Sequence, residues 1–309
     1  MAALDLGSGT VKLSVFQAQG GRWAALALEE ANTELRRGMG ADLTLKAAPI
    51  VDTLEAVRAF RAQAEALGVR GLPAYATSAV RRAANPQDLL WPLKAMGIQT
   101  VVLAEEEEGR WNLLGAQARL GHAVPMLVID PGGDSTECTA DLTGQGWQKA
   151  QVASLPFGSV SLQEAHGTPH DNEPIVWRQL QAASAAAKAA ALAHPAFGAF
   201  VGAPLTPAIR VNAPIQRALE QVNGRPLTPH GDGGLYRRAE LEALCRHTAS
   251  LDHAGRAALL QGEPLGKVDR TCYGFASWLG ILDALGADQF QAEPWGIKLG
   301  AVIALNGLS

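Results

Sequence analysis

A short glycine-rich sequence that occurs twice places the strongest constraint on the fold of this chain. Residues 5–10 read Asp-Leu-Gly-Ser-Gly-Thr, and residues 130–137 read Asp-Pro-Gly-Gly-Asp-Ser-Thr-Glu. Each copy follows an apolar strand and precedes a second strand and a Gly turn, and Asp5 and Asp130 lie 125 positions apart. This duplication predicts two lobes of like fold, each with a strand–turn–strand loop whose backbone N–H groups can cradle a phosphate. Two such loops are typical of a phosphoryl-transfer or phosphate-hydrolysis site.

The composition fits a folded protein with two domains of ordinary size. Of the 309 residues, 48% are apolar and 18% are charged, which argues against a disordered chain. The net charge of −4 provides no general attraction for polyanions, so no nucleic-acid partner is expected. An anionic ligand must therefore be held by local donors.

The cysteines and the apolar segments predict a cytoplasmic protein without a membrane partner. Cys138, Cys245 and Cys272 are odd in number and widely separated, and they lack a metal-ligand spacing. We expect free thiols in a reducing compartment. No apolar run reaches 18 residues, and no signal peptide precedes the first expected strand, which begins at residue 2.

Hydrophobic periodicity predicts alternating strands and helices in the first half of the chain. Residues 2–31 form three short strands, and Asn85 is the expected N-cap of a helix that starts at Pro86. The expected elements that follow the three strands are a helix at 50–67, a strand at 72–76, a helix at 86–96, a strand at 99–103 and a helix at 105–120.

The same order of elements recurs in outline from Met126. The second half adds an Ala-rich helix at about 174–193, a strand at 199–201 and a mostly helical C-terminal third. Residues 230–234, His-Gly-Asp-Gly-Gly, are expected to form one exposed loop between helices.

Several motifs together resemble the exopolyphosphatase and guanosine pentaphosphate phosphohydrolase (Ppx/GppA) family, within the actin-like ATPase superfold. The matching stretches are AALDLGSGTVKLSV, YATSAVRRAANPQDLL, EEEEGRWNLLGA, MLVIDPGGDSTE and SLPFGSVSLQE, with a weaker match at FVGAPLTPAIR and a tail that ends in WGIKLGAVIAL. They occur in family order over essentially the whole chain, which is far more specific than one Gly-rich loop.

This resemblance implies an α/β fold with two ribonuclease-H-like lobes and a cleft between them. Lobe I is expected to comprise residues 1–121 with a C-terminal helix at about 296–309, and lobe II residues 122–295. The last helix would pack back on lobe I. The family also implies Mg²⁺-dependent removal of a terminal phosphate, and several of its members pair as dimers, so a homodimer is an expected assembly.

Two residues of the first half resemble catalytic residues of the family. Glu108 matches the catalytic glutamate, and a carboxylate there can accept a proton from, or orient, the water that attacks phosphorus. Arg81 is similar to an active-site arginine, whose guanidinium can bind the terminal phosphate bidentately. Acids are also favoured at helix N-termini by the macrodipole, which explains residues 105–107 without a catalytic role. Arg36 resembles a further basic position with weaker support.

The two strand-end aspartates are the predicted metal ligands. Asp5 and Asp130 lie at equivalent points of the two lobes, where carboxylates can hold Mg²⁺, or Mn²⁺, against phosphates; their alternative role is to cap the Gly turn. Asp130 is thereby also a predicted catalytic residue, and Glu137 resembles an acidic family residue that contacts the metal or its water. The predicted phosphate-binding residues are Gly7, Ser8, Gly9, Thr10, Gly132, Gly133, Ser135 and Thr136.

Other positions depart from the family pattern. Asp134 stands where relatives have a third glycine, and an acid facing a phosphate would repel it. Pro204 falls in residues 201–206, which in relatives form a Gly-containing loop that lines the cleft. Lys298 begins Lys-Leu-Gly where the family shows Arg-Glu-Gly. Together these changes leave reduced or lost catalysis open.

The resulting interpretation is a Mg²⁺-dependent phosphoanhydride hydrolase that releases terminal phosphate from inorganic polyphosphate. The alternatives are a guanosine pentaphosphate (pppGpp) phosphohydrolase and a catalytically impaired regulator that binds phosphate or an alarmone. A sugar or acetate kinase of the same superfold is a third interpretation, which fits the glutamate run and residues 154–164 less well.

Overall fold

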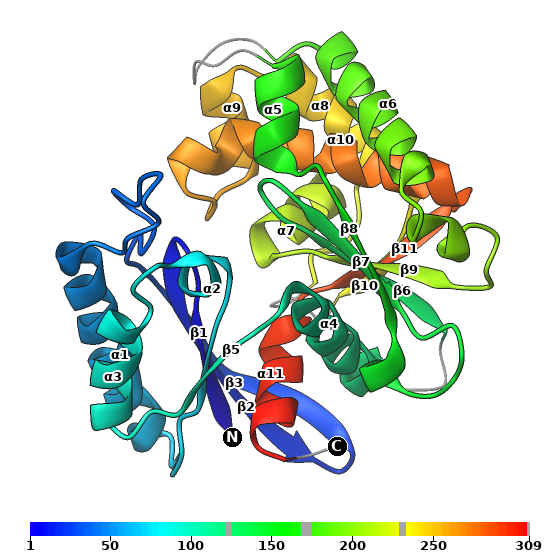
Figure 1. Cartoon of the computed structure of the whole chain (residues 1–309). Coiled ribbons are helices and arrows are strands. Elements are labelled where there is room, and N and C mark those ends of the chain that lie inside the picture. Colours follow the sequence, from blue (N-terminus) through cyan, green and yellow to red (C-terminus); the bar gives the residue numbers. More distant parts are fainter. Residues whose placement is uncertain (121–124, 168–174, 229–232, 308–309) are drawn as a thin grey trace. The chain divides into compact units, whose positions relative to one another are not determined.

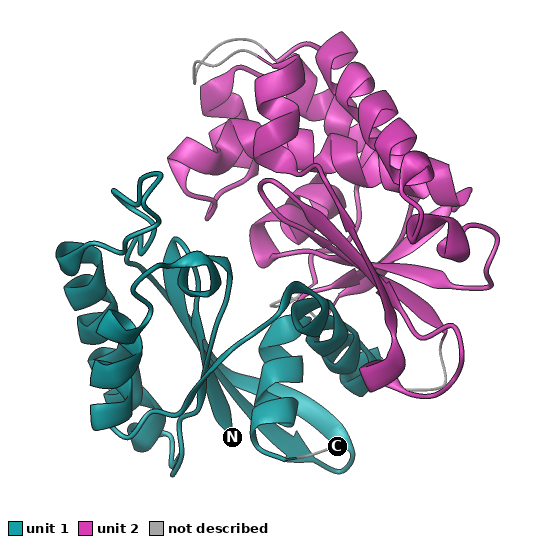
Figure 2. Ribbon diagram, viewed as in Figure 1, with its two compact units in different colours: residues 1–121, 296–309 teal, residues 122–295 magenta. Residues whose placement is uncertain are grey.

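The computed structural model describes residues 1–120, 125–167, 175–228 and 233–307 (Figure 1). The chain divides into two compact units (Figure 2). Unit 1 comprises Met1–Gly121 together with Gly296–Ser309, and unit 2 comprises His122–Trp295. Each unit is built on one mixed β-sheet.

The sheet of unit 1 has five strands in the order β3-β2-β1-β4-β5. Its strands are β1 (Ala2–Leu6), β2 (Thr10–Gln19), β3 (Arg22–Asn32), β4 (Ala74–Ala76) and β5 (Thr100–Val102). The first three strands pair antiparallel as a meander, whereas β4 and β5 run parallel to β1. Parallel neighbours need crossover connections, and helices provide them.

Helices pack on both faces of this sheet (Figure 1). They are α1 (Ala47–Ala66), α2 (Ser78–Arg82), α3 (Gln87–Ala95), α4 (Glu105–Leu120) and α11 (Ile297–Leu305). α1 contacts β1, β2 and α3, while α11 contacts β1, β2 and α4. The buried side chains of α1 recur every three or four residues, which places an apolar stripe against the sheet. They include Ile50, Leu54, Val57, Phe60 and Ala64.

The sheet of unit 2 repeats this topology and adds one strand. Its strands are β6 (Met126–Pro131), β7 (Thr136–Ala140), β8 (Gln151–Leu155), β9 (Thr206–Arg210), β10 (Gly234–Arg237) and β11 (Gln289–Glu293). The order β8-β7-β6-β9-β11 matches β3-β2-β1-β4-β5, and β10 pairs antiparallel at the edge. The predicted fold class, α/β with two ribonuclease-H-like lobes, is thereby confirmed.

One apolar helix, α10, organises the helical part of unit 2. The helices of this unit are α5 (Ser159–His166), α6 (Trp177–Ala193), α7 (Ala213–Val222), α8 (Arg238–Ser250), α9 (His253–Leu259) and α10 (Val268–Leu285). α10 contacts α5, α6, α8 and α9 (Figure 1). Most of its residues are buried, which is typical of a helix surrounded by others.

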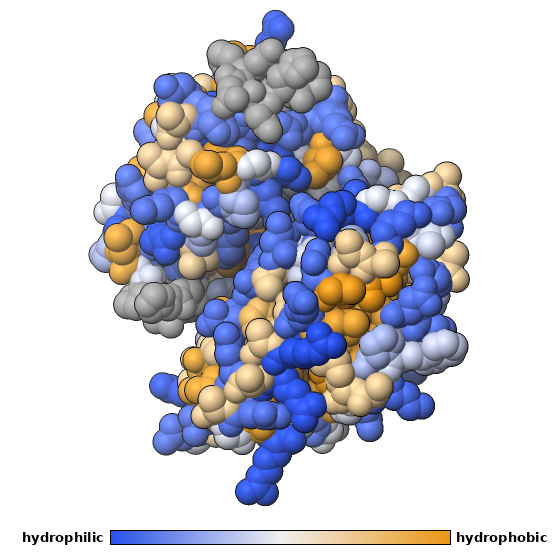
Figure 3. All heavy atoms as spheres, turned by 90° about the vertical axis from the view of Figure 1, so that its left-hand side faces the viewer, coloured by the Kyte–Doolittle hydropathy of each residue, from blue (hydrophilic) through white to orange (hydrophobic). Residues whose placement is uncertain are grey.

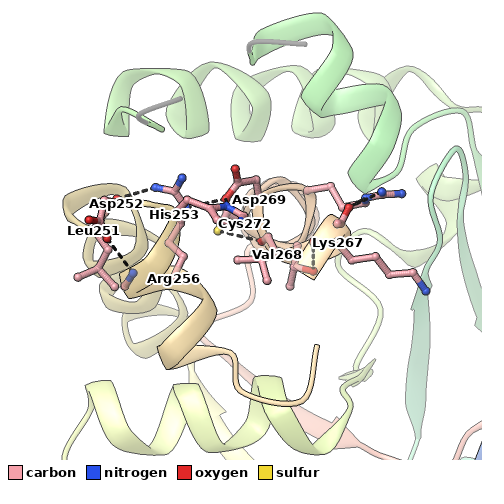
Figure 4. A network of polar contacts seen from close by, with 12 residues as sticks. Leu251, Asp252, His253, Arg256, Lys267, Val268, Asp269 and Cys272 are labelled. Carbon is pink, nitrogen blue, oxygen red and sulfur yellow. Dashed lines mark hydrogen bonds and ion pairs between the residues drawn. The ribbon is translucent and has the colours of Figure 1, made fainter. Parts of the chain in front are cut away.

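A buried ion pair joins α9 to α10 (Figure 4). The Arg256 side chain is fully buried, and its Nε donates to Asp269 Oδ1 at 2.8 Å. Arg256 Nη1 also donates to the Leu251 carbonyl at 2.5 Å, and His253 Nδ1 lies 3.1 Å from the same Asp269 oxygen. Because a buried charge is stable only when paired and hydrogen-bonded, this network ties the two helices together.

All three cysteines are buried free thiols, as predicted. Burial raises the pKa of the Cys138 and Cys245 thiols well above the ordinary value and raises the pKa of Cys272 to about 12. Because the thiolate is the reactive form, these residues are structural rather than nucleophilic.

Most elements of the first half agree with the periodicity, but the predicted cap of α3 is wrong. Pro86 occupies the N-cap position, and Asn85 has another task. Its Oδ1 accepts from the Leu45 N–H at 2.8 Å, and its Nδ2 donates to the Leu45 carbonyl at 3.1 Å. Asn85 Nδ2 also donates to Asp88 Oδ2 at 2.7 Å, so Asn85 links this distant segment to the first turn of α3.

The second half departs from prediction around β9. Residues 197–200 form a 3₁₀ helix, so the expected strand at 199–201 is wrong, and the strand lies at Thr206–Arg210. Pro207 lies within this strand, opposite Leu127 of β6, and proline normally argues against an interior strand. The strands β10 and β11 were also not predicted. Of the expected loop at 230–234, residues 230–232 lie outside the described residues, and Gly234 begins β10.

Hydrophilic side chains cover most of the face shown in Figure 3, with hydrophobic side chains in smaller groups among them. Within residues 1–120, 125–167, 175–228 and 233–307, none of the helices combines the length and the apolar composition of a membrane span.

The C-terminal helix α11 makes an unusually close contact with α4. A Cβ added to Gly300 would lie 1.8 Å from the Trp111 carbonyl oxygen, and one added to Gly115 would lie 2.0 Å from the Gly296 oxygen. In addition, Asn112 Oδ1 accepts from the Ile297 N–H at 2.7 Å and caps the first turn of α11. Only glycine permits the two backbones to approach this closely.

Replacement of Gly300 by alanine should therefore destabilise unit 1. The new Cβ meets a backbone oxygen that cannot move alone, and such overpacking costs about 1–3 kcal/mol in the free energy of unfolding. Urea denaturation of G300A against wild type measures it. G71A is the matched control, because a Cβ at Gly71 meets no atom within 4 Å. Equal stability of G300A and G71A would contradict the predicted clash.

Candidate active site

The first glycine-rich loop joins β1 to β2 in unit 1, and hydrogen bonds to its backbone carbonyl groups hold it in place. The Gly7 N–H donates to the Thr10 carbonyl at 3.0 Å and closes the turn. The Ser8 carbonyl accepts from the Arg36 N–H at 2.9 Å, and the Gly9 carbonyl accepts from residues 33 and 34. The segment that follows β3 therefore anchors this loop.

The second loop, between β6 and β7 of unit 2, is built in the same way. The Gly132 N–H donates to the Ser135 carbonyl at 2.8 Å. The Gly132 carbonyl accepts from the Ser159 N–H at 3.1 Å, and the Gly133 carbonyl accepts from the Val160 N–H at 2.8 Å. The donors belong to the first turn of α5, so the loop carbonyls cap this helix.

These anchored carbonyls determine where the loop N–H groups point. In a trans peptide unit the C=O and N–H groups point in opposite directions. The Gly133 and Asp134 N–H groups are therefore directed away from α5, and neither makes a hydrogen bond within the described residues. They remain candidate phosphate donors, as does the Gly9 N–H of unit 1. The predicted donors Gly7 and Gly132 instead use their N–H groups to close the turns.

The side chains that follow the second loop point alternately to the two faces of the sheet. Ser135 Oγ donates to Glu137 Oε1 at 2.7 Å, and Ser154 Oγ donates to the same oxygen at 3.1 Å. Thr136 lies between them, is fully buried, and donates to the Phe157 carbonyl at 2.8 Å. Successive strand residues face opposite sides of a sheet, so Ser135 and Thr136 cannot both face a phosphate. The prediction that Thr136 binds phosphate is wrong.

The strand ends of unit 2 carry a row of charged residues across the sheet. Ser154, Glu137 and Asp130 are register partners on β8, β7 and β6. Ile129 of β6 is the register partner of Ile209 of β9, so Arg210 follows beside Asp130. On the other side of β9, Glu293 of β11 is the register partner of Arg210. Residues in register point to the same face. Arg210 Nε donates to Asp130 Oδ1, and Arg210 Nη2 lies 3.4 Å from the Pro131 carbonyl oxygen.

The equivalent aspartate of unit 1 also has a cationic neighbour. Asp5 is the register partner of Lys12 on β2, and Lys12 Nζ lies 3.8 Å from Asp5 Oδ2. Lys12 occupies the place that Glu137 has in unit 2, so the two rows differ in charge at this position. Each strand-end aspartate thus has a basic partner from an adjacent strand. In unit 1 this strand is the antiparallel neighbour, β2, and in unit 2 it is the parallel neighbour, β9.

Arg81 and Glu108, the predicted catalytic pair, meet within unit 1. Arg81 lies in the short helix α2, and its Nη1 donates both to Glu108 Oε1 and to the Leu103 carbonyl oxygen, each at 2.7 Å. Arg81 Nη2 donates to Glu105 Oε1 at 3.1 Å. About a quarter of each of the Arg81 and Glu108 side chains is exposed (23% and 23%). The Leu103 carbonyl thus fixes the guanidinium, and the guanidinium orients the carboxylate of Glu108.

The rest of the glutamate run has other functions. Glu107 Oε2 accepts from the Ala104 N–H at 3.0 Å and caps the start of α4. The Glu106 side chain is exposed and makes no hydrogen bond or ion pair within the described residues. Glu108 is thus distinguished from its neighbours by partial burial and by its arginine partner.

The three departures from the family pattern lie in different places. Asp134 is exposed at the tip of the second loop, at the position equivalent to Gly9 in the first loop. Pro204 precedes β9, whereas Asp130 lies level with the carboxyl end of that strand, where Arg210 and Asn212 follow. Residues 201–206 therefore lie at the opposite end of β9 from Asp130. Lys298 lies in the first turn of α11 in unit 1.

Within its own unit, each predicted metal ligand has partners from the protein. Asp5, Asp130 and Glu137 supply the hard oxygen atoms that Mg²⁺ prefers. However, Asp130 is bound to Arg210, Asp5 has Lys12 as its neighbour, and Glu137 accepts from two serine hydroxyls. The described residues contain no group of three or more His, Cys, Asp or Glu side chains placed to hold an ion. The requirement for Mg²⁺ or Mn²⁺ stays a prediction.

A profile of the Ppx/GppA phosphatase family matches residues 14–306, which is nearly the whole chain. This chain belongs to the Ppx/GppA phosphatase family. The resemblance of its motifs to that family is thus confirmed, and the order of its strands agrees with it.

Solved structures of Ppx/GppA proteins share the fold. The Aquifex aeolicus family member is 21% identical, with a TM-score of 0.82 over 99% of this chain and 96% of that protein. A second structure, the type II variant of the Aquifex aeolicus Ppx/GppA phosphatase, is also 21% identical, with a TM-score of 0.81 over 98% of each chain. An exopolyphosphatase from Cytophaga hutchinsonii is 18% identical, with a TM-score of 0.76 over 100% of this chain and 98% of that protein.

Sequence reasoning missed Arg210, the residue that binds Asp130. The available signal was its place after an apolar run, Pro207–Ile209, which ends a strand as Val128–Ile129 does before Asp130. Pro207 itself begins this run, and proline normally argues against an interior strand. The basic residue at the end of the run was not predicted as a site residue.

The tight junction between α5 and the second loop can be tested with Gly158. A Cβ at this position would lie 2.3 Å from the Gly133 oxygen and 2.6 Å from the Gly132 oxygen. The φ of Gly158, −153°, is extended and suits any residue. Any loss of stability in G158A should therefore come from the clash and not from backbone strain. We expect G158A to lose about 1–3 kcal/mol of unfolding free energy through overpacking.

Thermal and urea unfolding measure this loss, and G198A, whose Cβ would meet no atom within 4 Å, is the control within unit 2. A G158A protein as stable as G198A would show that the loop yields easily and is not held by α5.

Proposed function

We propose that this member of the Ppx/GppA family is a phosphoanhydride hydrolase that releases the terminal phosphate of inorganic polyphosphate. The observation that carries the proposal is the Arg81–Glu108 pair, a partly exposed carboxylate held by a guanidinium that is itself fixed by the Leu103 carbonyl. A carboxylate oriented in this way suits the positioning of a water molecule, which is the main task in phosphate hydrolysis.

Each residue of the pair has a distinct role in this proposal. Glu108 orients the attacking water and accepts its proton through the carboxylate. Arg81 keeps that carboxylate in place and offsets the charge that develops on the phosphoryl oxygens. The guanidinium suits this role because its fork can serve a carboxylate and a phosphate oxygen together.

The second loop would supply donors to phosphate oxygens. The N–H groups of Gly133 and Asp134 are directed away from α5 by their anchored carbonyls. Adjacent N–H groups in a turn form an anion-binding concavity at no further cost in reorganisation. Loops of this kind recognise any terminal phosphate and do not by themselves select one substrate.

Two arginines of unit 1 support an extended polyanion as the substrate. Arg36 and Arg82 line a pocket of about 210 Å³ together with Ser78. Both arginines are exposed, and neither side chain makes a hydrogen bond or ion pair within the described residues. Guanidinium groups without internal partners suit successive phosphates of a chain. They provide the local attraction that the negative net charge of the protein does not.

Two alternatives use the same residues. A pppGpp phosphohydrolase would remove a terminal phosphate by the same chemistry. Impaired catalysis is supported by the exposed carboxylate of Asp134 at the loop tip, because a negative charge there opposes the productive approach of a phosphate group. The expected homodimer and the cytoplasmic location stay predictions.

A phosphate-release assay distinguishes these possibilities. The purified protein is incubated with Mg²⁺ and, separately, with tripolyphosphate, long-chain polyphosphate and pppGpp. Release from either polyphosphate in excess of pppGpp supports the proposal, and the reverse preference supports the alarmone hydrolase. Binding of a ligand without release, measured by calorimetry, supports the impaired binder and refutes the hydrolase.

Glu108→Gln should reduce turnover by about 100-fold or more and leave substrate affinity nearly unchanged, because a general base contributes about that much. The amide keeps the size of the side chain and loses the charge that orients water. Steady-state kinetics and substrate binding should both be measured. Glu106→Gln, an exposed acid of the same helix, is the matched control and should retain turnover. Near-normal turnover of E108Q would remove Glu108 from the mechanism.

We also expect the activity to require Mg²⁺ or Mn²⁺, because these ions neutralise phosphate oxygens that would otherwise repel a nucleophile. Chelation with excess EDTA should abolish phosphate release, and Mg²⁺ or Mn²⁺ should restore it. Zn²⁺ should not substitute, since the candidate residues offer oxygen ligands only. Full activity in the chelator would contradict the predicted metal requirement.

A further inference from the structure

The row of charged residues at the strand ends of unit 2 contains more acids than bases, which matters for the binding of a metal ion. Across β7, β6, β9 and β11 the row consists of Glu137, Asp130, Arg210 and Glu293, where Arg210 and Asp130 each follow the last register pair between β9 and β6. Three are acids, and Arg210 is the one cation among these four. Acids directly opposite one another on a sheet are destabilising, so such a row needs a positive charge.

We infer that Arg210 is a resident counter-ion that occupies the metal-binding face of Asp130 and excludes a divalent cation from it. Arg210 Nε donates to Asp130 Oδ1, and its Nη2 faces the Pro131 carbonyl. The guanidinium therefore occupies one of the two carboxylate oxygens of Asp130 and places a positive charge beside the other, which opposes the approach of a metal ion. The inference does not depend on phosphate hydrolysis, and it takes only one premise from the sequence, the prediction that Asp130 is a metal ligand.

The position of Arg210 in the fold makes this contact durable. The side chain projects from the end of β9, whose register with β6 is held by the parallel ladder from Met126 to Ile129. About a third of it (34%) is exposed, compared with 18% for Asp130. Arg210 also lines a pocket of about 130 Å³ with Gly132, Ser159 and Asn212. A rigid strand thus places the guanidinium next to the second glycine-rich loop.

The chemistry of the two cations makes them competitors. Arginine keeps its charge at every accessible pH, and its planar fork binds a carboxylate without a hydration shell to remove. Mg²⁺ must lose water to bind a carboxylate directly, and it does so reluctantly. A tethered guanidinium is also present at a high effective concentration. Asp130 is therefore occupied by Arg210, and a divalent ion used in hydrolysis must enter on the phosphate oxygens of the substrate.

Direct binding of Mn²⁺ without substrate tests this inference. Free Mn²⁺ is measured by electron paramagnetic resonance during titration of wild type, R210Q, R217Q and the double variant R210Q/D130N. We expect R210Q to bind one Mn²⁺ about tenfold or more tightly than wild type, since removal of an adjacent unit charge is worth at least that much in a partly buried site. The double variant should lose the gain.

R217Q is the matched control for loss of one positive charge. Arg217 is an exposed residue of α7 in the same unit, and it binds the Gln261 carbonyl rather than an acid. It should bind Mn²⁺ like wild type. Equal affinity of R210Q and wild type, or a gain that survives D130N, would overturn the inference.

The wild type provides a second test that does not depend on the folding of R210Q. A Mn²⁺ site present in wild type and lost in D130N would overturn the inference by itself. Because no measurement uses hydrolysis, this outcome is separate from the phosphate-release assay. A protein that releases no phosphate can still show the expected Mn²⁺ binding, and an active one can fail to show it.

Discussion

The hydrogen bonds that anchor the carbonyl groups of the two glycine-rich loops are the constraint on which the rest of this protein depends. In unit 1 the donors follow β3, and in unit 2 they are the first N–H groups of α5. A planar peptide unit then directs the next N–H away from the anchor. The same bonds that cap α5 therefore orient the Gly133 and Asp134 N–H groups as candidate anion donors.

Charge pairing is the second organising principle of both units. Asp5 has Lys12 beside it, Asp130 has Arg210, and Glu108 has Arg81. The Arg81–Glu108 pair leaves both groups partly exposed and suits a residue that must act on a water molecule. The Asp130–Arg210 pair instead satisfies the acid from within the protein. Among the equivalent positions of the duplicated fold, the charge differs where Lys12 of unit 1 corresponds to Glu137 of unit 2.

Much of the fold and part of the candidate site could be predicted because their signals are local. The glycine-rich loops, the helix that opens at Glu105 and the family motifs are contiguous in the sequence. Arg81 and Glu108 were each expected as site residues only through the family resemblance, and their contact with one another across 27 positions was not predicted. The errors arose where local rules conflict with tertiary pairing. Proline normally argues against an interior strand, but the ladder between β6 and β9 forms in spite of Pro207.

The sequence by itself determined the duplicated architecture, the family and the identity of the acids and glycines, because periodicity and motif order are properties of the chain. Only the tertiary structure decided which of these groups are free to act. Thr136 faces the interior because strand residues alternate, and Gly132 uses its N–H to close a turn. Arg210 binds Asp130 although the two residues are 80 positions apart in the sequence. Hydrogen bonds and ion pairs between distant strands are set by register, and register depends on how the whole sheet buries its apolar face.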